Sequence, residues 1–300
     1  MKIAAIDIGS NAIRLQITKI LSYDELITFK KLEYIRFPLR LGHDVFNTGS
    51  ISEFNIVRFK KLMTAYKNMI DLYEIDHYYG CATSAMREAI NGAQVLNEVS
   101  EELGLTIDII NGETEAELIN EVIGPNLDEK TYVHIDVGGG STEINFYVKK
   151  QKVLSKSFKI GGVRRLHNLD KSETWDEMRQ WIINQVKDHK RKITAIGTGG
   201  NINKVIELAM VGKRRKMNID SVMKVKEYLA NMTLEEKLNR LQLNPDRADV
   251  IVPATEIYIG VMEAAGAKSI LVPDVGLKDG INYHLFQQHY PKKGKVLVKN

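Results

Sequence analysis

Two ten-residue segments, 129 positions apart, carry the side chains best suited to do chemistry in this chain. The first spans residues 6–15 (IDIGSNAIRL) and the second spans residues 135–144 (IDVGGGSTEI). They align without a gap, with Asp7 on Asp136 and Gly9 on Gly138. A repeated apolar strand that runs into a glycine-bearing turn predicts a β-hairpin in each copy. Each turn is expected to expose backbone N–H groups beside a carboxylate.

Exposed backbone amides bind anionic oxygens, and carboxylates hold hydrated Mg²⁺. Asp7 and Asp136 are therefore predicted to hold Mg²⁺ through water, with Glu143 as a further oxygen ligand or a water-positioning group. Arg14 is a candidate phosphate clamp, although an exposed strand arginine is the plainer alternative. The predicted phosphate-binding turn residues are Gly9, Ser10, Asn11, Gly138, Gly139, Gly140 and Ser141.

Neither copy belongs to the two best-known phosphate motifs. A P-loop requires Gly-x-x-x-x-Gly-Lys-[Ser/Thr], which occurs nowhere in the chain. In a dinucleotide fingerprint a helix follows the glycines, whereas a strand pattern follows them here. The repeat therefore predicts two facing phosphate-binding hairpins of a different kind.

A third candidate is the acidic helix start at residues 111–117 (NGETEAE). Glu113 and Glu117 share one helical face, and Glu115 points to the opposite side. Acidic residues in a first turn are also explained by the helix dipole alone. A carboxylate facing a bound phosphate would have a raised pKa and could accept a proton from water. The spacing does not decide whether the face of Glu113 and Glu117 or the face of Glu115 would lie toward a bound phosphate.

Two further segments could contact phosphate. Ser84 and Arg87 begin a helix after a strand, so their amides and guanidinium could bind a terminal phosphate, or simply cap the helix and face solvent. The turn of Gly197, Gly199 and Gly200 also follows a buried-type strand and suits close backbone approach to a ligand. The basic run at 213–216, with Arg164, Arg165 and Lys204, is either a solvated loop or the lining of a channel for a polyanion.

The elements around these residues follow the same order in each half. Strands are predicted at 3–8, 12–20 and 25–37, and again at 131–137, 142–149 and 152–160. Helices and single strands alternate after each set, including a helix at 247–265, a loop at 276–280 and a final helix at 281–289. Hairpins followed by β/α alternation predict α/β domains with mixed sheets. The break at Gly124 gives domains of 1–124 and 125–300, with the segment from about 281 to 300 as a candidate to pack on the first.

The bulk properties fit a two-domain chain of 300 residues. Its net charge of +4 is compatible with a polyanionic ligand but does not indicate a nucleic-acid partner. The single cysteine, Cys81, excludes an internal disulfide and fits a reducing compartment. With no evident signal peptide or membrane-spanning run, we expect a cytoplasmic protein without a membrane partner.

Taken together, these motifs resemble the exopolyphosphatase/guanosine pentaphosphate phosphohydrolase (Ppx/GppA) family of the actin-like ATPase superfamily. The resemblance is carried by residues 5–11 (AIDIGSN), 109–116 (IINGETEA) and 135–143 (IDVGGGSTE). Residues 40–42 (RLG), 83–87 (TSAMR), 197–200 (GTGG) and 276–280 (GLKDG) follow in the family's order. The resemblance covers nearly the whole chain.

The resemblance implies two ribonuclease-H-like domains with mixed five-stranded sheets flanking a cleft. It implies Mg²⁺-dependent removal of terminal phosphate, with Mn²⁺ as the alternative cofactor. The substrate would be inorganic polyphosphate or guanosine pentaphosphate (pppGpp), and a homodimer is the alternative to a monomer. Glu115 matches the family's proposed catalytic carboxylate, Asp136 and Glu143 its metal and water-positioning acids, and Arg87 its phosphate-binding arginine. The glycines of 197–200 and Lys278 would contact the nucleotide or the chain.

Three positions depart from the family pattern: Ala12 and Asn111 each replace a usual serine, and Lys278 replaces a usual arginine. Lysine keeps the charge but loses bidentate phosphate geometry. The chain also ends near the point where longer members add helical domains. Two alternatives stay open: an ATP-dependent small-molecule kinase on the same fold, and a sensor that binds an alarmone without cleaving it.

Overall fold

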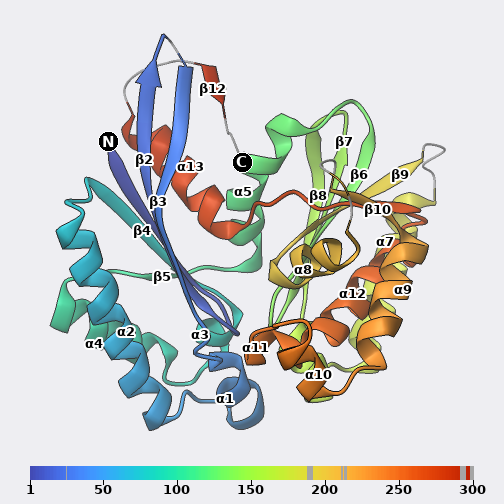
Figure 1. Ribbon diagram of the computed structural model, residues 1–300, viewed down its shortest axis with the longest axis horizontal. Coiled ribbons are helices and arrows are strands. Elements are labelled where there is room, and N and C mark those ends of the chain that lie inside the picture. Colours follow the sequence, from blue (N-terminus) through green and yellow to red (C-terminus); the bar gives the residue numbers. More distant parts are fainter. Residues whose placement is uncertain (25, 188–191, 211, 213–214, 291–294, 298–300) are drawn as a thin grey trace. The chain divides into compact units, whose positions relative to one another are not determined.

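The computed structural model describes residues 1–300 except 25, 188–191, 211, 213–214, 291–294 and 298–300 (Figure 1). The chain forms two units, Met1–Val122 together with Gly276–Asn300, and Ile123–Val275. The second unit thus ends at Val275, whereas the sequence predicted a second domain that extends to residue 300. The final helix packs on the first unit, because it contacts three strands of that unit's sheet.

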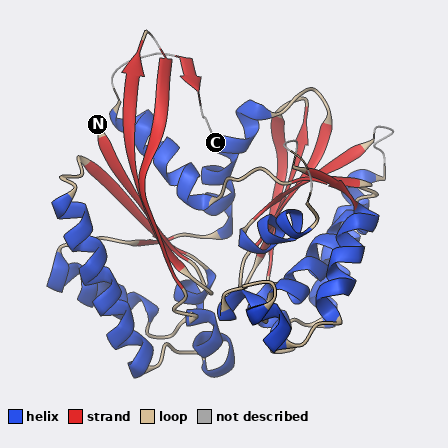
Figure 2. Ribbon diagram, in the orientation of Figure 1, coloured by secondary structure: helices blue, strands red, loops and turns tan. Residues whose placement is uncertain are grey.

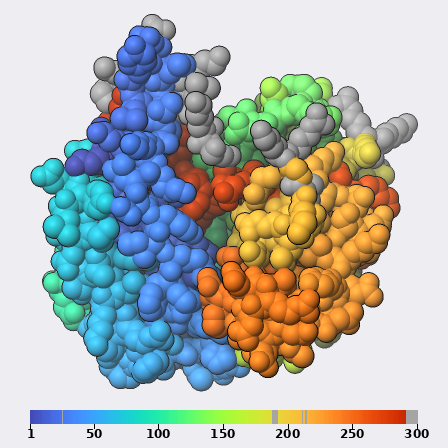
Figure 3. Space-filling view, in the orientation of Figure 1, coloured from blue at the N-terminus to red at the C-terminus, as the bar shows by residue number. Residues whose placement is uncertain are grey.

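The first unit is built on a mixed sheet with the strand order β12-β3-β2-β1-β4-β5. Its strands are β1 (Lys2–Ile8), β2 (Ile13–Tyr23), β3 (Leu26–Phe37), β4 (His77–Ala82), β5 (Asp108–Ile109) and β12 (Lys295–Leu297). The first three pair as an antiparallel meander, and β4 and β5 add parallel strands beside β1. Figure 3 shows the surface of β2 and β3 in blue. Tyr23, the last residue of β2, is 79% exposed.

The two faces of this sheet differ, because successive strand residues point to opposite sides. Ala4, Ile6 and Ile8 of β1 face a hydrophobic core formed with α2 and α4. The odd-numbered residues, including Asp7, face the side on which α13 contacts β1, β2 and β4 (Figure 2). The helices of this unit are α1 (Leu41–Thr48), α2 (Glu53–Leu72), α3 (Ser84–Glu88), α4 (Gly92–Leu103), α5 (Gly112–Ile123) and α13 (Leu277–His289).

The second unit repeats this plan, with the strand order β10-β11-β9-β6-β7-β8. Its strands are β6 (Thr131–Val137), β7 (Thr142–Val148), β8 (Gln151–Phe158), β9 (Ile193–Thr198), β10 (Lys216–Asn218) and β11 (Ser269–Leu271). The antiparallel set β6, β7 and β8 and the parallel strands β9 and β11 match β1 to β5 in order and direction. The duplication predicted from the repeat is therefore present in the topology.

Helices α7, α9 and α12 lie together on one face of the second sheet (Figure 1). They bury Val133, Ile135 and Val137 of β6 in a large hydrophobic core. The helices are α6 (Gly162–Leu166), α7 (Ser172–Val186), α8 (Gly200–Leu208), α9 (Ile219–Ala230), α10 (Leu234–Asn239), α11 (Pro245–Ala248) and α12 (Ile251–Ala264), and a 3₁₀ turn spans Gly124–Asn126. No described helix combines the length and apolar character needed to cross a membrane.

The two α/β units with mixed sheets are confirmed, and three details differ from the expectation. Among the described residues each sheet has six strands, not five, because the three-residue edge strands β10 and β12 are too short to show a period of two. The helix expected at 247–265 is divided into α11 and α12. The loop expected at 276–280 is helical from Leu277, and Gly280 lies inside α13, where its missing side chain lets the helix approach the backbone of Leu118 in α5.

Candidate active site

The turn of the first hairpin is held by the start of α1. The amide of Gly42 donates to the Ser10 carbonyl at 2.7 Å, and the amide of Arg40 donates to the Asn11 carbonyl at 3.0 Å. In a trans peptide the carbonyl and the following N–H point in opposite directions. The N–H groups of Asn11 and Ala12 therefore point away from α1, as an anion-binding turn requires.

The turn of the second hairpin is held in the same way by the start of α6. The amide of Gly162 donates to the Gly138 carbonyl at 3.0 Å, and the amide of Arg164 to the Gly139 carbonyl at 3.2 Å. The buried Arg164 side chain donates from Nε to the Gly140 carbonyl at 2.7 Å. All three glycine carbonyls are thus occupied on one side, and the N–H groups that follow them point to the other.

The two hairpins differ at one pair of facing positions. Asp7 faces Arg14 across β1 and β2, and Arg14 Nη1 donates to Asp7 Oδ2 at 2.6 Å. At the equivalent position of the second hairpin, Asp136 faces Glu143 across β6 and β7. Glu143 is 2% exposed, and its Oε1 accepts a hydrogen bond from Ser157 Oγ at 2.8 Å. The first hairpin therefore carries an ion pair where the second carries two acids.

Two facing carboxylates fit a divalent cation. Like charges directly opposite in a sheet destabilise it unless a cation lies near them. Mg²⁺ is usually bound by one or two carboxylates, with water and substrate phosphates completing the octahedron. Within the described ranges no group of three or more His, Cys, Asp and Glu side chains is arranged to hold a metal ion. The donor set of Asp136 and Glu143 thus fits a Mg²⁺ that shares its coordination with substrate.

On the first unit, the negative charges of Asp7 and Glu115 both act on one buried thiol. Cys81 is fully buried and neighbours Asp7 in the β1–β4 register. Burial first, and then the negative charges of Asp7, Asp108 and Glu115, raise the pKa of the Cys81 thiol to about 12. Glu115 therefore lies within electrostatic range of the sulfur that Asp7 also faces.

The structure distinguishes the three acids of α5. Glu113 and Glu117 are exposed, whereas Glu115 is half-buried. The helix begins as expected, because Asn111 Oδ1 accepts a hydrogen bond from the Thr114 amide at 2.8 Å. Asn111 thus does the capping work of the serine it replaces.

Ser84 and Arg87 connect α3 to two predicted parts of the site. The Ser84 and Ser10 hydroxyls are buried and hydrogen-bonded at 2.8 Å, which ties α3 to the first turn. Arg87 Nη1 donates to the Ile110 carbonyl at 2.5 Å, directly before the start of α5. A guanidinium has five N–H donors, so this bond leaves Arg87 capacity for a phosphate.

The later glycines have different environments. A Cβ on Gly197 would lie 2.8 Å from Ile270 Cδ1, so this glycine is explained by packing inside β9. Gly199 has φ of 111°, and a Cβ there would lie 3.4 Å from Asp136 Oδ1. Gly200 begins α8 beside the guanidinium of Arg247. Lys278, on the first unit, is paired through Nζ with Asp279 at 2.5 Å.

Three residues have contacts at the turns that their sequence motifs did not indicate. Arg40 adopts a left-handed conformation (φ 60°) where its amide binds the first turn, and such strain in a non-glycine residue often marks a functional site. Arg164 was considered only as channel lining, although its contact is with Gly140. Tyr258, in the apolar run of α12, gave no polar signal, yet its hydroxyl reaches β6 and β9.

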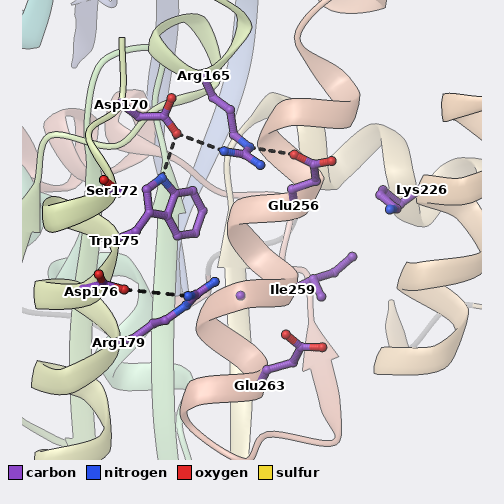
Figure 4. Close-up of a pocket in the computed structure, with 11 residues that line it drawn as sticks. Arg165, Asp170, Ser172, Trp175, Asp176, Arg179, Lys226, Glu256, Ile259 and Glu263 are labelled. Atoms are coloured by element: carbon purple, nitrogen blue, oxygen red, sulfur yellow. Dashed lines mark hydrogen bonds and ion pairs between the residues drawn. The ribbon is translucent and has the colours of Figure 1, made fainter. Parts of the chain in front are cut away.

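A cavity of about 470 Å³ in the second unit contains another basic residue of the expected polyanion channel, Arg165 (Figure 4). Its guanidinium pairs with Glu256 at 2.6 Å and Asp170 at 3.0 Å, and stacks over Trp175. Arg165 is therefore neutralised within the protein. Lys204 likewise pairs with Glu207, and residues 213 and 214 lie outside the described residues.

Each of the two α/β units carries a hairpin whose turn N–H groups are oriented as an anion-binding turn requires. The sequence matches the Ppx/GppA phosphatase family over residues 20–289, and the chain belongs to this family. This match confirms the resemblance to the Ppx/GppA family that the sequence motifs indicated.

Individual relatives agree with this assignment. The chain is 29% identical to a bifunctional 3-dehydroquinate synthase/phosphatase of Fusobacterium nucleatum subsp. nucleatum, over 90% of this chain but only 44% of that protein. It is 23% identical to a putative exopolyphosphatase of Haemophilus influenzae, over 95% of this chain and 91% of that protein. The fold matches the crystal structure of the Aquifex aeolicus Ppx/GppA family member with a TM-score of 0.77, at 24% identity over 97% of this chain and 99% of that one.

Proposed function

We propose that this protein is a Mg²⁺-dependent phosphohydrolase that removes the terminal phosphoryl group from a phosphoanhydride chain. One observation carries the proposal: Glu115 is half-buried in the first turn of α5, whereas Glu113 and Glu117 of the same helix are exposed. A carboxylate at that place can take a proton from an attacking water. Membership of a phosphatase family supports the same reaction class.

In the proposed reaction, the oriented amides of both turns bind phosphoryl oxygens. Arg14 and Arg87 add positive charge beside the first turn and the start of α5. Glu115 accepts a proton from water as the water oxygen bonds to the terminal phosphorus. The bond from that phosphorus to the bridging oxygen breaks, which releases orthophosphate and a chain shorter by one unit. Mg²⁺ held by Asp136 and Glu143 would supply charge neutralisation to the phosphate oxygens.

Inorganic polyphosphate is the first candidate substrate and pppGpp the second. Polyphosphate is favoured by the Haemophilus influenzae relative, which matches most of its length and is named a putative exopolyphosphatase. The second candidate rests on a relative from Aeromonas hydrophila, which is named a guanosine-5'-triphosphate,3'-diphosphate pyrophosphatase and is 24% identical over 96% of this chain and 60% of that protein. Both offer a terminal phosphoanhydride to the same turns.

The test is phosphate release by the purified full chain from long-chain polyphosphate and, separately, from pppGpp, each with and without Mg²⁺. The proposal predicts Mg²⁺-dependent orthophosphate release from at least one substrate, with ppGpp as the other product from pppGpp. Transfer of phosphate from ATP to a sugar or to acetate would instead identify a kinase. Nucleotide binding without any phosphate release would identify a sensor.

A further inference from the structure

A tyrosine hydroxyl lies within the end of the β6–β9 ladder. Tyr258 of α12 is fully buried, and its hydroxyl donates to the Thr198 carbonyl while accepting from the Val137 amide at 3.3 Å. The parallel register of these strands ends at the facing pair Asp136 and Thr198. One phenol therefore takes the place that a direct backbone bond would occupy between the two strand ends.

The position of this hydroxyl matters because both strands lead directly into glycine turns. Val137 precedes the Gly138 turn, and Thr198 precedes Gly199. A Cβ on Gly199 would lie 3.1 Å from the Tyr258 hydroxyl and 3.4 Å from Asp136 Oδ1. The phenol, the Gly199 backbone and the Asp136 carboxylate are therefore packed against one another.

We propose that Tyr258 is a positioning residue that sets the separation of the two glycine turns and thereby the place of the Asp136 carboxylate. The inference rests on the proposed function for its catalytic consequence, since Asp136 is there a metal ligand. Without the hydroxyl, the Val137 amide and the Thr198 carbonyl lose the partner that joins them. The spacing of the two strand ends, and with it the position of Gly199 beside Asp136, is then no longer fixed by this bridge.

The distinguishing variant is Tyr258→Phe, which keeps the ring and removes the hydroxyl. Tyr147→Phe is its matched control, because Tyr147 of β7 is equally buried in the same unit and its hydroxyl has no hydrogen-bond partner among the described residues. Removing a hydroxyl that bonds to nothing should be neutral or stabilising.

Two measurements test the inference, and the first does not depend on activity. Hydrogen exchange should quicken at the Val137 amide and at the amides of residues 199–201 in Tyr258→Phe and not in Tyr147→Phe. In phosphate-release assays, the Mg²⁺ concentration for half-maximal rate should rise about tenfold in Tyr258→Phe, as for other partners that orient a metal ligand. A purely structural role would lower thermal stability and leave this Mg²⁺ dependence unchanged.

Unchanged exchange at these amides overturns the inference, and so does a Mg²⁺ dependence equal to that of Tyr147→Phe. If the wild type releases no phosphate from either substrate, the proposed function fails, and the catalytic consequence fails with it. Faster local exchange confined to Tyr258→Phe would then still support the phenol as the bridge that sets the two strand ends, and its absence would refute that bridge.

Discussion

Glu143 lies directly across the β6–β7 ladder from Asp136, at the position where Arg14 faces Asp7 in the first hairpin. In the first pair, one guanidinium nitrogen of Arg14 forms a 2.6 Å ion pair with Asp7. The second places two acids side by side, one of them 2% exposed. The duplicated hairpins therefore differ in charge at one equivalent position, and this difference assigns them different tasks in the proposed reaction.

Replacing the charged side chain that faces the aspartate in each hairpin with neutral glutamine should separate these two tasks. Glu143→Gln removes one of two metal-binding acids, so the Mg²⁺ concentration for half-maximal activity should rise about tenfold or more. Arg14→Gln removes a cation from the first turn, so the substrate KM should rise while the Mg²⁺ requirement stays the same. Steady-state rates across a grid of Mg²⁺ and substrate concentrations measure both. Identical kinetic changes in the two variants would contradict the division of tasks.

Arg164 should stabilise the second turn through its bond to the Gly140 carbonyl. Arg164→Met keeps much of the aliphatic packing but leaves that carbonyl without the guanidinium, at a cost of about 1–3 kcal/mol in the free energy of unfolding. Activity should fall with stability, because the turn amides lose their fixed orientation. Arg179→Met, an exposed arginine of the same unit, is the control for loss of charge. Urea unfolding of both variants provides the comparison; equal stabilities would refute the role.

Gly280 should resist substitution although it lies in a helix, where alanine is normally favoured by up to about 1 kcal/mol. A Cβ there would lie 2.2 Å from the Leu118 carbonyl oxygen, so Gly280→Ala should force α13 away from α5 and destabilise the protein by about 1–3 kcal/mol. Gly276→Ala, with no atom within 4 Å of its Cβ position, should be close to neutral. The thermal midpoints of Gly280→Ala and Gly276→Ala test whether alanine destabilises the helix at position 280, opposite to its usual effect. A Gly280→Ala variant more stable than wild type would contradict the packing argument.

The unfolding free energy should depend on the ionisation of Glu121, which bonds His284 of α13 at 3.3 Å. Burial raises the pKa of Glu121 above its usual value of 4.5, despite the opposing effect of His284. The folded protein therefore binds the proton more tightly than the unfolded chain, so this group's contribution to stability falls as pH rises from 4.5 through the raised pKa. Glu121→Gln should flatten the pH dependence of the thermal midpoint in that window. A dependence identical to the wild type would show that Glu121 is not its source.

Local features of the fold could be predicted from the sequence, because they depend on residues close together in the chain. A hairpin is a local structure, so the repeat predicted β1, β2, β6 and β7. Ser52 as the cap of α2 is local in the same sense, since its side chain accepts from the Asn55 amide.

Features that depend on distant segments could not be predicted this way. The turn carbonyls are bound by residues at the starts of α1 and α6, which follow the turns by about 20 to 30 residues. The spacing of apolar residues in the sequence does not predict a contact of this kind. Gly280 looked like a loop residue because the reason for it, Leu118, lies far away in the sequence. Tyr258 sits in an apolar helix whose pattern indicates only burial. The choice of Glu115 over Glu113 and Glu117 likewise needed either the family resemblance or the structure.

The most direct test of the account compares Glu115→Gln with Glu113→Gln. Both change one carboxylate to an amide in the first turn of α5, but Glu113 is exposed and Glu115 is half-buried. Phosphate release from polyphosphate and pppGpp at saturating Mg²⁺ should fall about 10²- to 10⁴-fold in kcat for Glu115→Gln, the usual contribution of a general base. It should stay within about twofold of wild type for Glu113→Gln, since surface changes of this kind have little effect. Full activity of Glu115→Gln on both substrates would contradict the proposed mechanism.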